Sequence, residues 1–294
     1  MGKYSYLFAA VIIAVSSLFI SSCKKQSYIK LAFEEKMVQS KGETFTVSVE
    51  SSSNWIVKED EEITWCSISK VNNSEAKIVV LPNNTYDIRS AIFRFQCEDV
   101  QASLVITQSL PANILSYTSS DENVINPRIS AFSSDIKSNE YKDGYGVITF
   151  SSDINGIGYD AFFNCTSLTS IIIPEGVTSI GGCAFEGCTS LTSITIPEGV
   201  ISIGSGAFEG CTSLTSITLP ETLTFIGDDT FKGCTSLASV YCKPRLPPSI
   251  NKRGCMFDNN APERKIYVPV HLVALYKIYT GWSDYSSSIV GYNF

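Results

Sequence analysis

The hydrophobic positions of residues 157–243 recur at one fixed interval, because four kinds of residue each return every 23 positions. An interval of roughly 20–29 residues predicts a solenoid, in which each repeat forms one coil and buries its apolar side chains only by stacking on the next coil. The four columns are Gly158, Gly181, Gly204 and Gly227; Phe162, Phe185, Phe208 and Phe231; Cys165, Cys188, Cys211 and Cys234; and Leu168, Leu191, Leu214 and Leu237.

One repeat shows what each coil contains. In residues 191–196 the spacing L-x-x-I-x-I points the apolar residues to one side of a strand. Pro197 ends this strand, because proline has no N–H for the ladder. A second extended piece over residues 200–203 and a short helical turn over residues 207–211 complete the coil, since apolar residues spaced by three and four share one helical face.

Residues 30–109 have a different pattern, with short runs of alternating apolar and polar residues separated by polar turns. The clearest runs are residues 44–49, 78–81, 91–95 and 104–108. Several short strands at this spacing predict an Ig-like β-sandwich, and no helical period is present.

The segments on either side of the repeats are expected to cover the open ends of the solenoid. Residues 110–156 form a junction and N-terminal cap, with a strand over residues 146–150. Residues 244–294 form a C-terminal cap, in which a strand over residues 266–269 precedes a short helix over residues 272–279. The predicted fold class is therefore mainly β: a sandwich followed by a solenoid with short helical turns and terminal caps.

The repeats resemble the BspA-like leucine-rich repeats of bacterial surface proteins. The matching string, residues 180–197, is I-G-G-C-A-F-E-G-C-T-S-L-T-S-I-T-I-P. The likeness covers residues 157–243 closely and is specific for the fold rather than for a ligand. It departs at the end, where Asp228-Asp229-Thr230 precedes Phe231 and Lys243 replaces the repeat proline. The resemblance implies adhesion to a host or extracellular-matrix protein.

Residues 30–109 resemble the BACON domain of Bacteroidetes proteins, whose name implies carbohydrate binding. The strand-like context of the two tryptophans indicates buried core residues instead of a sugar platform. The features that carry the resemblance are, in order, Trp55-Ile56-Val57, Trp65-Cys66-Ser67-Ile68, Asn83-Asn84, Arg89-Ser90-Ala91-Ile92 and Ile106-Thr107-Gln108.

Residues 1–22 are predicted to be a lipoprotein signal peptide. Their apolar stretch, Leu7–Ile20, has 14 residues and is shorter than a membrane-spanning helix. The sequence Leu18-Phe19-Ile20-Ser21-Ser22-Cys23 resembles a bacterial lipobox, which implies that Cys23 is the lipidated first residue, followed by a tether over residues 23–29. An ordinary signal peptide with a chance cysteine is the alternative. We expect an outer-membrane lipoprotein of the cell envelope, at the cell surface or facing the periplasm.

Charge and composition exclude several classes of function. The chain has 22 Lys and Arg against 29 Asp and Glu, a net charge of −7 with no basic stretch, so nucleic acid is not an expected partner. His271 is the one histidine, which removes multi-histidine metal sites and leaves little basis for histidine catalysis. No nucleophile elbow, H-E-x-x-H, P-loop or dinucleotide fingerprint is present. We expect no enzyme activity, no cofactor and no metal.

The ten cysteines are expected to serve packing more than chemistry. Stacked coils about 4.8 Å apart place the repeat cysteines in a line, which suits neither a tetrahedral zinc site nor a disulfide. A ladder of buried thiols is therefore expected. The sequence leaves open whether Cys66 bonds Cys97 and whether Cys242 bonds Cys255.

The outward positions of the repeat strands form the candidate ligand face. Their side chains are small, hydroxylated and nearly uncharged, and residues 157–243 contain eight acids and two bases, so an anionic ligand is disfavoured. No cluster of Trp, Tyr and Arg is expected on this face. Trp282, Tyr285 and Tyr292 are expected to pack in the C-terminal cap rather than to form a ligand platform. The candidate ligand residues are Ser170, Ile172, Ser193, Thr195, Ser216, Thr218, Ser239 and Tyr241.

The sequence thus predicts a non-enzymatic envelope lipoprotein whose solenoid binds a protein ligand of the host or the extracellular matrix. Two alternatives stay open: a glycan-binding accessory of a polysaccharide-utilisation system, and a spacer without a dedicated ligand. An exposed row of aromatic rings would favour the glycan, whereas a broad neutral surface of shallow relief would favour the protein.

Overall fold

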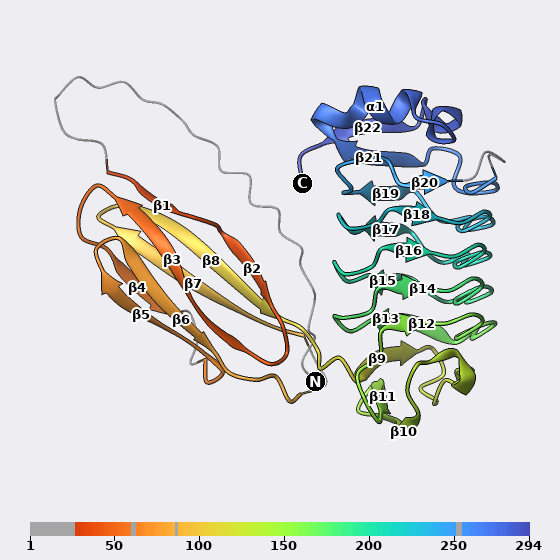
Figure 1. Ribbon diagram of the computed structural model, residues 1–294, viewed down its shortest axis with the longest axis horizontal. Coiled ribbons are helices and arrows are strands. Elements are labelled where there is room, and N and C mark those ends of the chain that lie inside the picture. The colour runs from red at the N-terminus through yellow and green to blue at the C-terminus, as the bar shows by residue number, and fades with distance from the viewer. Residues whose placement is uncertain (1–26, 60–62, 86–87, 251–254) are drawn as a thin grey trace.

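The structure is a computed structural model that describes residues 27–59, 63–85, 88–250 and 255–294. Figure 1 shows an N-terminal β-sandwich and a C-terminal solenoid. The buried apolar residues fall into two separate clusters, one in each part, so each part has its own core. The mainly β fold predicted from the sequence is confirmed. The predicted signal peptide and lipidation site, Cys23, lie outside the described residues.

The sandwich has two four-stranded sheets, and the alternation read from the sequence places every second residue inside. Val47, Phe93 and Phe95 are among its fully buried residues. One sheet has the order β1 (Ile29–Leu31), β3 (Glu43–Ser51), β6 (Glu75–Val80) and β5 (Cys66–Asn72). The other has the order β2 (Glu35–Val38), β8 (Val100–Gln108), β7 (Arg89–Cys97) and β4 (Ile56–Glu59).

A short linker, residues 109–113, joins the sandwich to the solenoid. Gln108, the last residue of β8, is fully buried, and its side-chain amide donates to the carbonyl oxygen of Leu81 at 2.9 Å. The side-chain amide of Asn83 donates to the carbonyl oxygen of Ser109, also at 2.9 Å. Because buried amides have few other partners, these bonds fix the point at which the chain leaves the sandwich.

The solenoid has two series of parallel strands, one on each side of its coils (Figure 1). The registers pair residues 23 positions apart, such as Ile171 with Ile194 and Ile217 with Val240, which confirms the repeat period. The longer strands are β13 (Leu168–Ile172), β15 (Ser193–Thr195), β17 (Ser216–Leu219), β19 (Ser239–Cys242) and β21 (Lys265–Pro269). The shorter strands are β12 (Gly156–Ile157), β14 (Ser179–Ile180), β16 (Ser202–Ile203), β18 (Phe225–Ile226) and β20 (Ser249–Ile250).

A ladder of stacked phenylalanine rings runs through the interior of the solenoid. Neighbouring rings have centroids 5.2–5.5 Å apart and interplanar angles of 1–8°. The last ring follows Phe231 by 26 residues instead of 23, because the coil that leads to β21 is longer than the others. The ladder consists of Phe162, Phe185, Phe208, Phe231 and Phe257.

Backbone hydrogen bonds join each coil to the next at the level of this ladder. The Phe185 N–H donates to the Ala207 carbonyl at 2.8 Å, and the Phe208 N–H donates to the Thr230 carbonyl at 2.9 Å. Within one coil, the Cys211 N–H donates to the Phe208 carbonyl at 3.2 Å. The helical turn expected over residues 207–211 is thus held by i→i+3 bonds alone, from the N–H groups of Ala207, Glu209 and Cys211, because the other N–H groups donate to the next coil.

The glycine column lies where successive coils approach most closely. A Cβ atom on Gly204 would lie 2.4 Å from the Gly182 nitrogen, and one on Gly227 would lie 2.3 Å from the Ser205 nitrogen. Both separations are far below van der Waals contact, so these positions require a residue without a side chain if the coils are to stack at this distance.

The N-terminal end of the stack is closed by antiparallel strands. β9 (Ile114–Ser119) pairs with β13 on one side and with β11 (Tyr145–Phe150) on the other, and β11 pairs with β10 (Ile136–Lys142). A short 3-10 helix, η1 (Ile129–Ala131), lies between β9 and β10 in the chain. β11 confirms the strand expected over residues 146–150.

The C-terminal end is closed by β22 (Ile289–Tyr292), which pairs with β21, and by the helices η2 (Val270–Leu272), α1 (Val273–Ile278) and η3 (Trp282–Tyr285). Trp282 is fully buried and donates its Nε1–H to the Pro248 carbonyl at 2.8 Å, and Tyr285 is 8% exposed. Both residues therefore pack in the cap, as expected. No helix among the described residues is long and apolar enough to cross a membrane.

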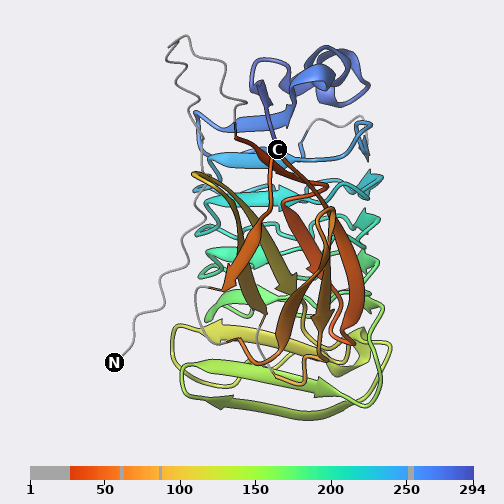
Figure 2. The same ribbon diagram turned by 90° about the vertical axis from the view of Figure 1, so that its left-hand side faces the viewer.

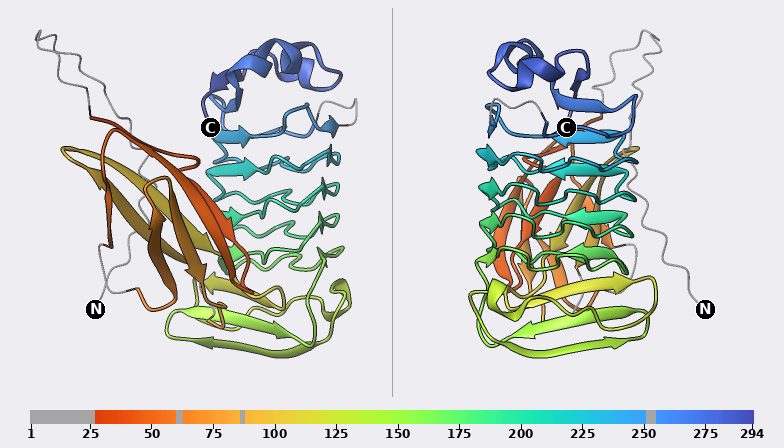
Figure 3. Two further views of the ribbon diagram at one scale, coloured as in Figure 1. Left: turned by 60° about the vertical axis from the view of Figure 1, so that its left-hand side comes forward. Right: turned by 90° about the vertical axis from the view of Figure 1, so that its right-hand side faces the viewer.

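Figure 2 looks onto the side of the solenoid that carries β13 to β21, and the sandwich lies on this side. Figure 3 shows the two parts from further directions, with the sandwich diverging from the coils toward the C-terminal cap. The outward surface of β13, β15, β17, β19 and β21 is called the strand face below.

Candidate functional site

The strand face holds all eight residues that the sequence singles out as ligand candidates. The register aligns them in two columns, with Ser170 beside Ser193 and Thr218 beside Tyr241. The exposed candidates all come from β15 and β17, which therefore form the open floor of the strand face. Exposed are Ser193, Thr195, Ser216 and Thr218, and half-buried are Ser170, Ile172, Ser239 and Tyr241.

The N-terminal end of the strand face is closed by side-chain hydrogen bonds from the cap. The Thr118 hydroxyl of β9 lies 2.6 Å from the hydroxyls of both Ser170 and Thr169. These hydroxyls satisfy one another, which reduces their capacity to bind a ligand. The floor is thus bounded on this side by β13.

An aromatic cluster bounds the floor on the other side. The ring of Tyr241 stacks on that of Tyr267 with centroids 4.8 Å apart and an interplanar angle of 13°. The ring of Tyr292 lies edge-on to both, at 5.5 and 5.6 Å, and is 38% exposed. These three residues are called the tyrosine cluster. The expectation that the strand face carries no such cluster is wrong. Tyr292 packs in the cap as expected, but it remains 38% exposed at the edge of the strand face.

The 23-residue period does not predict the tyrosine cluster, because Tyr267 follows Tyr241 by 26 residues instead of 23. The longer coil shifts β21 out of the repeat columns. A local signal is nevertheless present in the sequence: Tyr267 lies between the apolar residues Ile266 and Val268, and alternation along a strand then points Tyr267 outward. The structure confirms this, because Ile266 and Val268 are fully buried.

A row of carboxylates lies along one edge of the floor, just after the strands end. Lys243 Nζ lies 3.1 Å from Glu198 Oε1, and Arg245 pairs with Glu221. No cation among the described residues pairs with Glu175, the third member of the row. Burial, with the charge of Glu198 as a second cause, raises the pKa of Glu175. Glu175 is therefore the one carboxylate of this row that has no cation beside it among the described residues.

The repeat cysteines line the interior and act as hydrogen-bond donors between coils. Burial raises the pKa of each thiol, that of Cys234 to about 12, so the thiols stay protonated at neutral pH. The buried ladder expected from the sequence is confirmed for Cys188, Cys211 and Cys234, whereas Cys165 at its N-terminal end is half-buried. Cys188, Cys211 and Cys234 donate to the carbonyl oxygens of Phe162, Phe185 and Phe208 at 3.1, 3.1 and 3.0 Å.

No disulfide joins any of the nine cysteines that the structure describes. The two pairings left open by the sequence, Cys66 with Cys97 and Cys242 with Cys255, are therefore not formed. Cys242 is instead fully buried, with its Sγ 3.4 Å from the hydroxyl oxygen of Tyr276.

The two tryptophans of the sandwich pack against other residues of the sandwich. Trp55 is 1% exposed and donates its Nε1–H to the Asn73 carbonyl at 2.8 Å, which confirms it as a core residue. Trp65 is half-buried, with the guanidinium carbon of Arg89 4.5 Å from its ring centroid. Trp55 therefore offers no ring face to a sugar.

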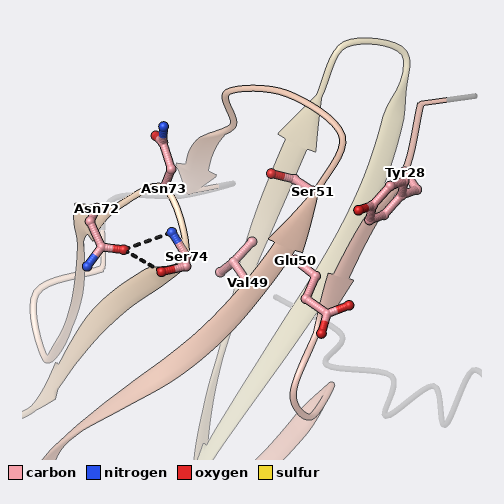
Figure 4. Close-up of a pocket in the computed structure, with 7 residues that line it drawn as sticks. All are labelled: Tyr28, Val49, Glu50, Ser51, Asn72, Asn73 and Ser74. Atoms are coloured by element: carbon pink, nitrogen blue, oxygen red, sulfur yellow. Dashed lines mark hydrogen bonds between the residues drawn. The ribbon is translucent and has the colours of Figure 1, made fainter. Parts of the chain in front are cut away.

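A shallow depression lies on the sandwich near the first described residues (Figure 4). The Asn72 side-chain oxygen accepts hydrogen bonds from the backbone nitrogen and the hydroxyl of Ser74, at 2.8 and 2.9 Å. The polar ends of Glu50 and Asn73 point away from each other (Figure 4), so the depression lacks a set of converging polar groups. It is lined by Tyr28, Val49, Glu50, Ser51, Asn72, Asn73 and Ser74.

Two family descriptions match the chain. The BspA type leucine rich repeat region matches residues 134–260 in six copies. The BACON family, whose description is that of an N-terminal binding domain, matches residues 49–109. No curated protein matches the chain at a significant level.

Several solved structures are similar to parts of the chain. A T. pallidum leucine-rich repeat protein is 30% identical with a TM-score of 0.37, and the match covers 48% of this chain and 63% of that protein. A leucine-rich cell surface protein of Faecalibacterium prausnitzii is 26% identical with a TM-score of 0.30, over 47% of this chain and 36% of that protein. A Bacteroides ovatus GH5 xyloglucanase is 18% identical with a TM-score of 0.27, over 29% of this chain and 20% of the enzyme.

The fold and its repeats define a leucine-rich-repeat solenoid protein. More particularly, the chain carries a BspA-type leucine-rich-repeat region behind a BACON domain. A solenoid of this type presents an extended binding surface, and neither matched family is a catalytic one. The class of protein is thus a binding protein.

Raising the pH is expected to destabilise the solenoid through its buried thiols. In the folded state Cys234 stays protonated up to about pH 12, whereas in the unfolded chain it ionises near its ordinary value of 9.0. The folded chain therefore binds more protons between these values. The free energy of unfolding falls as the pH rises through this range, by at most about 1.4 kcal/mol per pH unit for this thiol.

Urea unfolding followed by circular dichroism at a series of pH values measures this slope. Cys234→Ala is the matched control, because every tyrosine and lysine titrates alike in both proteins. We expect a shallower loss of stability with pH in the variant. Equal slopes for the two proteins would contradict a protonated, hydrogen-bonded thiol at this position.

Proposed function

We propose that the protein is a lipid-anchored binding protein of the bacterial cell envelope whose solenoid holds a protein ligand on the strand face. The observation that carries the proposal is the open floor of β15 and β17, bounded by the tyrosine cluster. These side chains are not used to hold the coils together, since packing takes place on the inner side of the same strands. They are free to serve a partner.

The composition of the strand face supports a protein ligand. Small hydroxylated side chains form a surface of low relief, and tyrosine is enriched in protein interfaces because it combines a large rigid ring with a polar end. Such a face matches the broad neutral surface expected for protein recognition. The resemblance to BspA-like surface proteins points to a host or extracellular-matrix protein.

The tyrosine cluster also favours a second candidate, a glycan ligand, because exposed aromatic rings are the feature expected of a sugar-binding face. On this reading the protein is an accessory of a polysaccharide-utilisation system. The cluster is compact rather than a row, and two of its rings stack on each other, so the protein ligand is the preferred proposal.

Lipid anchoring and envelope location are further parts of the proposal. The lipobox-like residues 18–23 and the polar tether that follows them support an outer-membrane lipoprotein. Cys23 would carry the lipid. Surface exposure and a periplasm-facing position are distinguished by protease treatment of whole cells.

Placing charge on the floor is expected to abolish protein capture. The probe is the chain from residue 23 onward with Cys23→Ser, tested against immobilised host matrix proteins and a glycan array. In Thr195→Lys and Thr218→Lys, the new ammonium group would be buried without a counter-charge between the strand face and the protein ligand. Binding should therefore weaken at least about tenfold. Both side chains are exposed, so folding is preserved.

Thr224→Lys, another exposed position on the opposite side of the coils, is the control and should bind as the parent does. Because the Thr224 hydroxyl donates to the Ile201 carbonyl at 3.1 Å, circular dichroism of this variant checks that the coils remain folded. Equal losses in all three variants would reject the strand face. Binding to glycans alone would favour the second candidate, and binding to neither panel would leave the chain as a spacer and contradict the proposal.

Cys23→Ala is expected to release the protein from the membrane. Lipoprotein processing needs the thiol of this residue, so the variant should lose incorporation of labelled palmitate and leave the membrane fraction. Ser22→Ala, which keeps a small residue before the cysteine, should remain anchored. A variant without Cys23 that still fractionates with membranes and takes up palmitate would contradict the lipidation site.

A further inference from the structure

We propose that the tyrosine cluster and the threonines beside it form a slot for one aromatic side chain of a protein partner that carries a basic residue nearby. The slot consists of the ring face of Tyr241 that is turned toward β17 and the exposed side chains of Thr218 and Thr195. The inference rests on the proposed function, because it names where on the strand face the protein ligand is held.

The slot exists because the size of the side chains changes abruptly along one column of strands. Thr218, Tyr241 and Tyr267 occupy the same register position on β17, β19 and β21. Tyr267 covers one face of the Tyr241 ring, and no further aromatic ring among the described residues stacks on the opposite face. Tyr241 therefore stands as a wall at the end of a floor of small side chains.

An aromatic ring suits this slot because it would continue the existing stack. Neighbouring strands lie about 4.8 Å apart, and the Tyr241 and Tyr267 rings are separated by the same 4.8 Å. A partner's ring placed above Thr218 would thus meet Tyr241 at the spacing that Tyr267 has on the other side. Offset-stacked rings at this separation attract each other beyond the gain from buried area alone.

The charges around the floor favour a basic partner. Glu198 and Glu221 have cations beside them, but Glu175 at the end of β13 has none among the described residues. β13 lies two strands from β17, about 10 Å, so a lysine or arginine two or three residues from the aromatic residue of an extended peptide reaches it. The eight acids and two bases of residues 157–243 attract the same kind of partner over longer distances.

A glycan suits the slot less well. Saccharides stack on flat ring faces that lie open side by side, whereas Tyr241 and Tyr267 turn their faces toward each other and Tyr292 is edge-on to both. The stacked pair leaves one ring face, and the exposed ring of Phe294 meets Tyr292 edge-on at 66°, so the rings do not form a flat platform for a run of sugar units.

Short peptides test the slot directly. The protein is the chain from residue 23 onward with Cys23→Ser and ring-labelled tyrosine, observed by NMR, and the probe is the amidated peptide Lys-Ala-Trp-Ala-Lys. We expect the Tyr241 signals to shift on titration. Glu-Ala-Trp-Ala-Glu should bind about tenfold more weakly, and Lys-Ala-Ala-Ala-Lys should leave the Tyr241 signals in place.

Thr218→Tyr is the decisive variant, because its own ring would occupy the slot and extend the stack. It should weaken binding of the tryptophan peptide at least about tenfold, whereas Thr218→Ser, which keeps the slot open, should bind within about twofold of the parent. An unchanged affinity for Thr218→Tyr overturns the slot. A Tyr241 shift caused by cellopentaose and not by the peptide also overturns it, in favour of the glycan.

Different experimental results would contradict the slot and the proposed function. If Thr195→Lys loses capture of matrix proteins while Thr218→Tyr keeps it, the strand face binds protein and the slot is wrong. If neither variant changes capture, the strand face itself is not the binding surface.

Discussion

Contact between successive coils is the interaction on which the rest of the structure depends. A single coil cannot bury its apolar residues. Each phenylalanine ring is instead buried by the rings of the neighbouring coils, whose centroids lie 5.2–5.5 Å away. Backbone N–H groups donate forward to the next coil, and thiols such as that of Cys211 donate back to the previous one. Glycines such as Gly204 permit this distance, because a side chain there would strike the neighbouring backbone.

The same spacing that orders the interior also orders the strand face. Positions one repeat apart fall into register, so small hydroxylated residues line up as a floor and Tyr241 stacks on Tyr267 at its end. The inward side chains of these strands pack in the core, whereas the outward side chains form the strand face. The outward residues can therefore change without disturbing the core. This separation explains how one scaffold can carry different ligand surfaces, and the ligand contacts proposed for this chain all lie on such outward positions of β15 and β17 and on the tyrosine cluster.

The sequence predicts the solenoid, the sandwich and the buried thiols because each rests on a period that the core enforces. The columns of Phe208 and Cys211 are visible without a structure, since every coil must fill the same space. The tyrosine cluster was missed for the opposite reason: the coil before β21 is longer, and Tyr267 leaves its column. The turn after Gly206 was expected to be helical, but bonds between coils compete for the same N–H groups, which a reading of one repeat does not reveal.

Hydrogen exchange of the full chain measures most directly whether the coils depend on one another. The amides of Phe185, Phe208 and Gly187 each donate to the next coil, so they should open together with one free energy. Phe208→Ala removes a ring from two contacts and should lower that free energy by about 3–5 kcal/mol at all these amides. Loss of protection confined to the mutated coil, with Phe185 and Gly187 unchanged, would contradict the account.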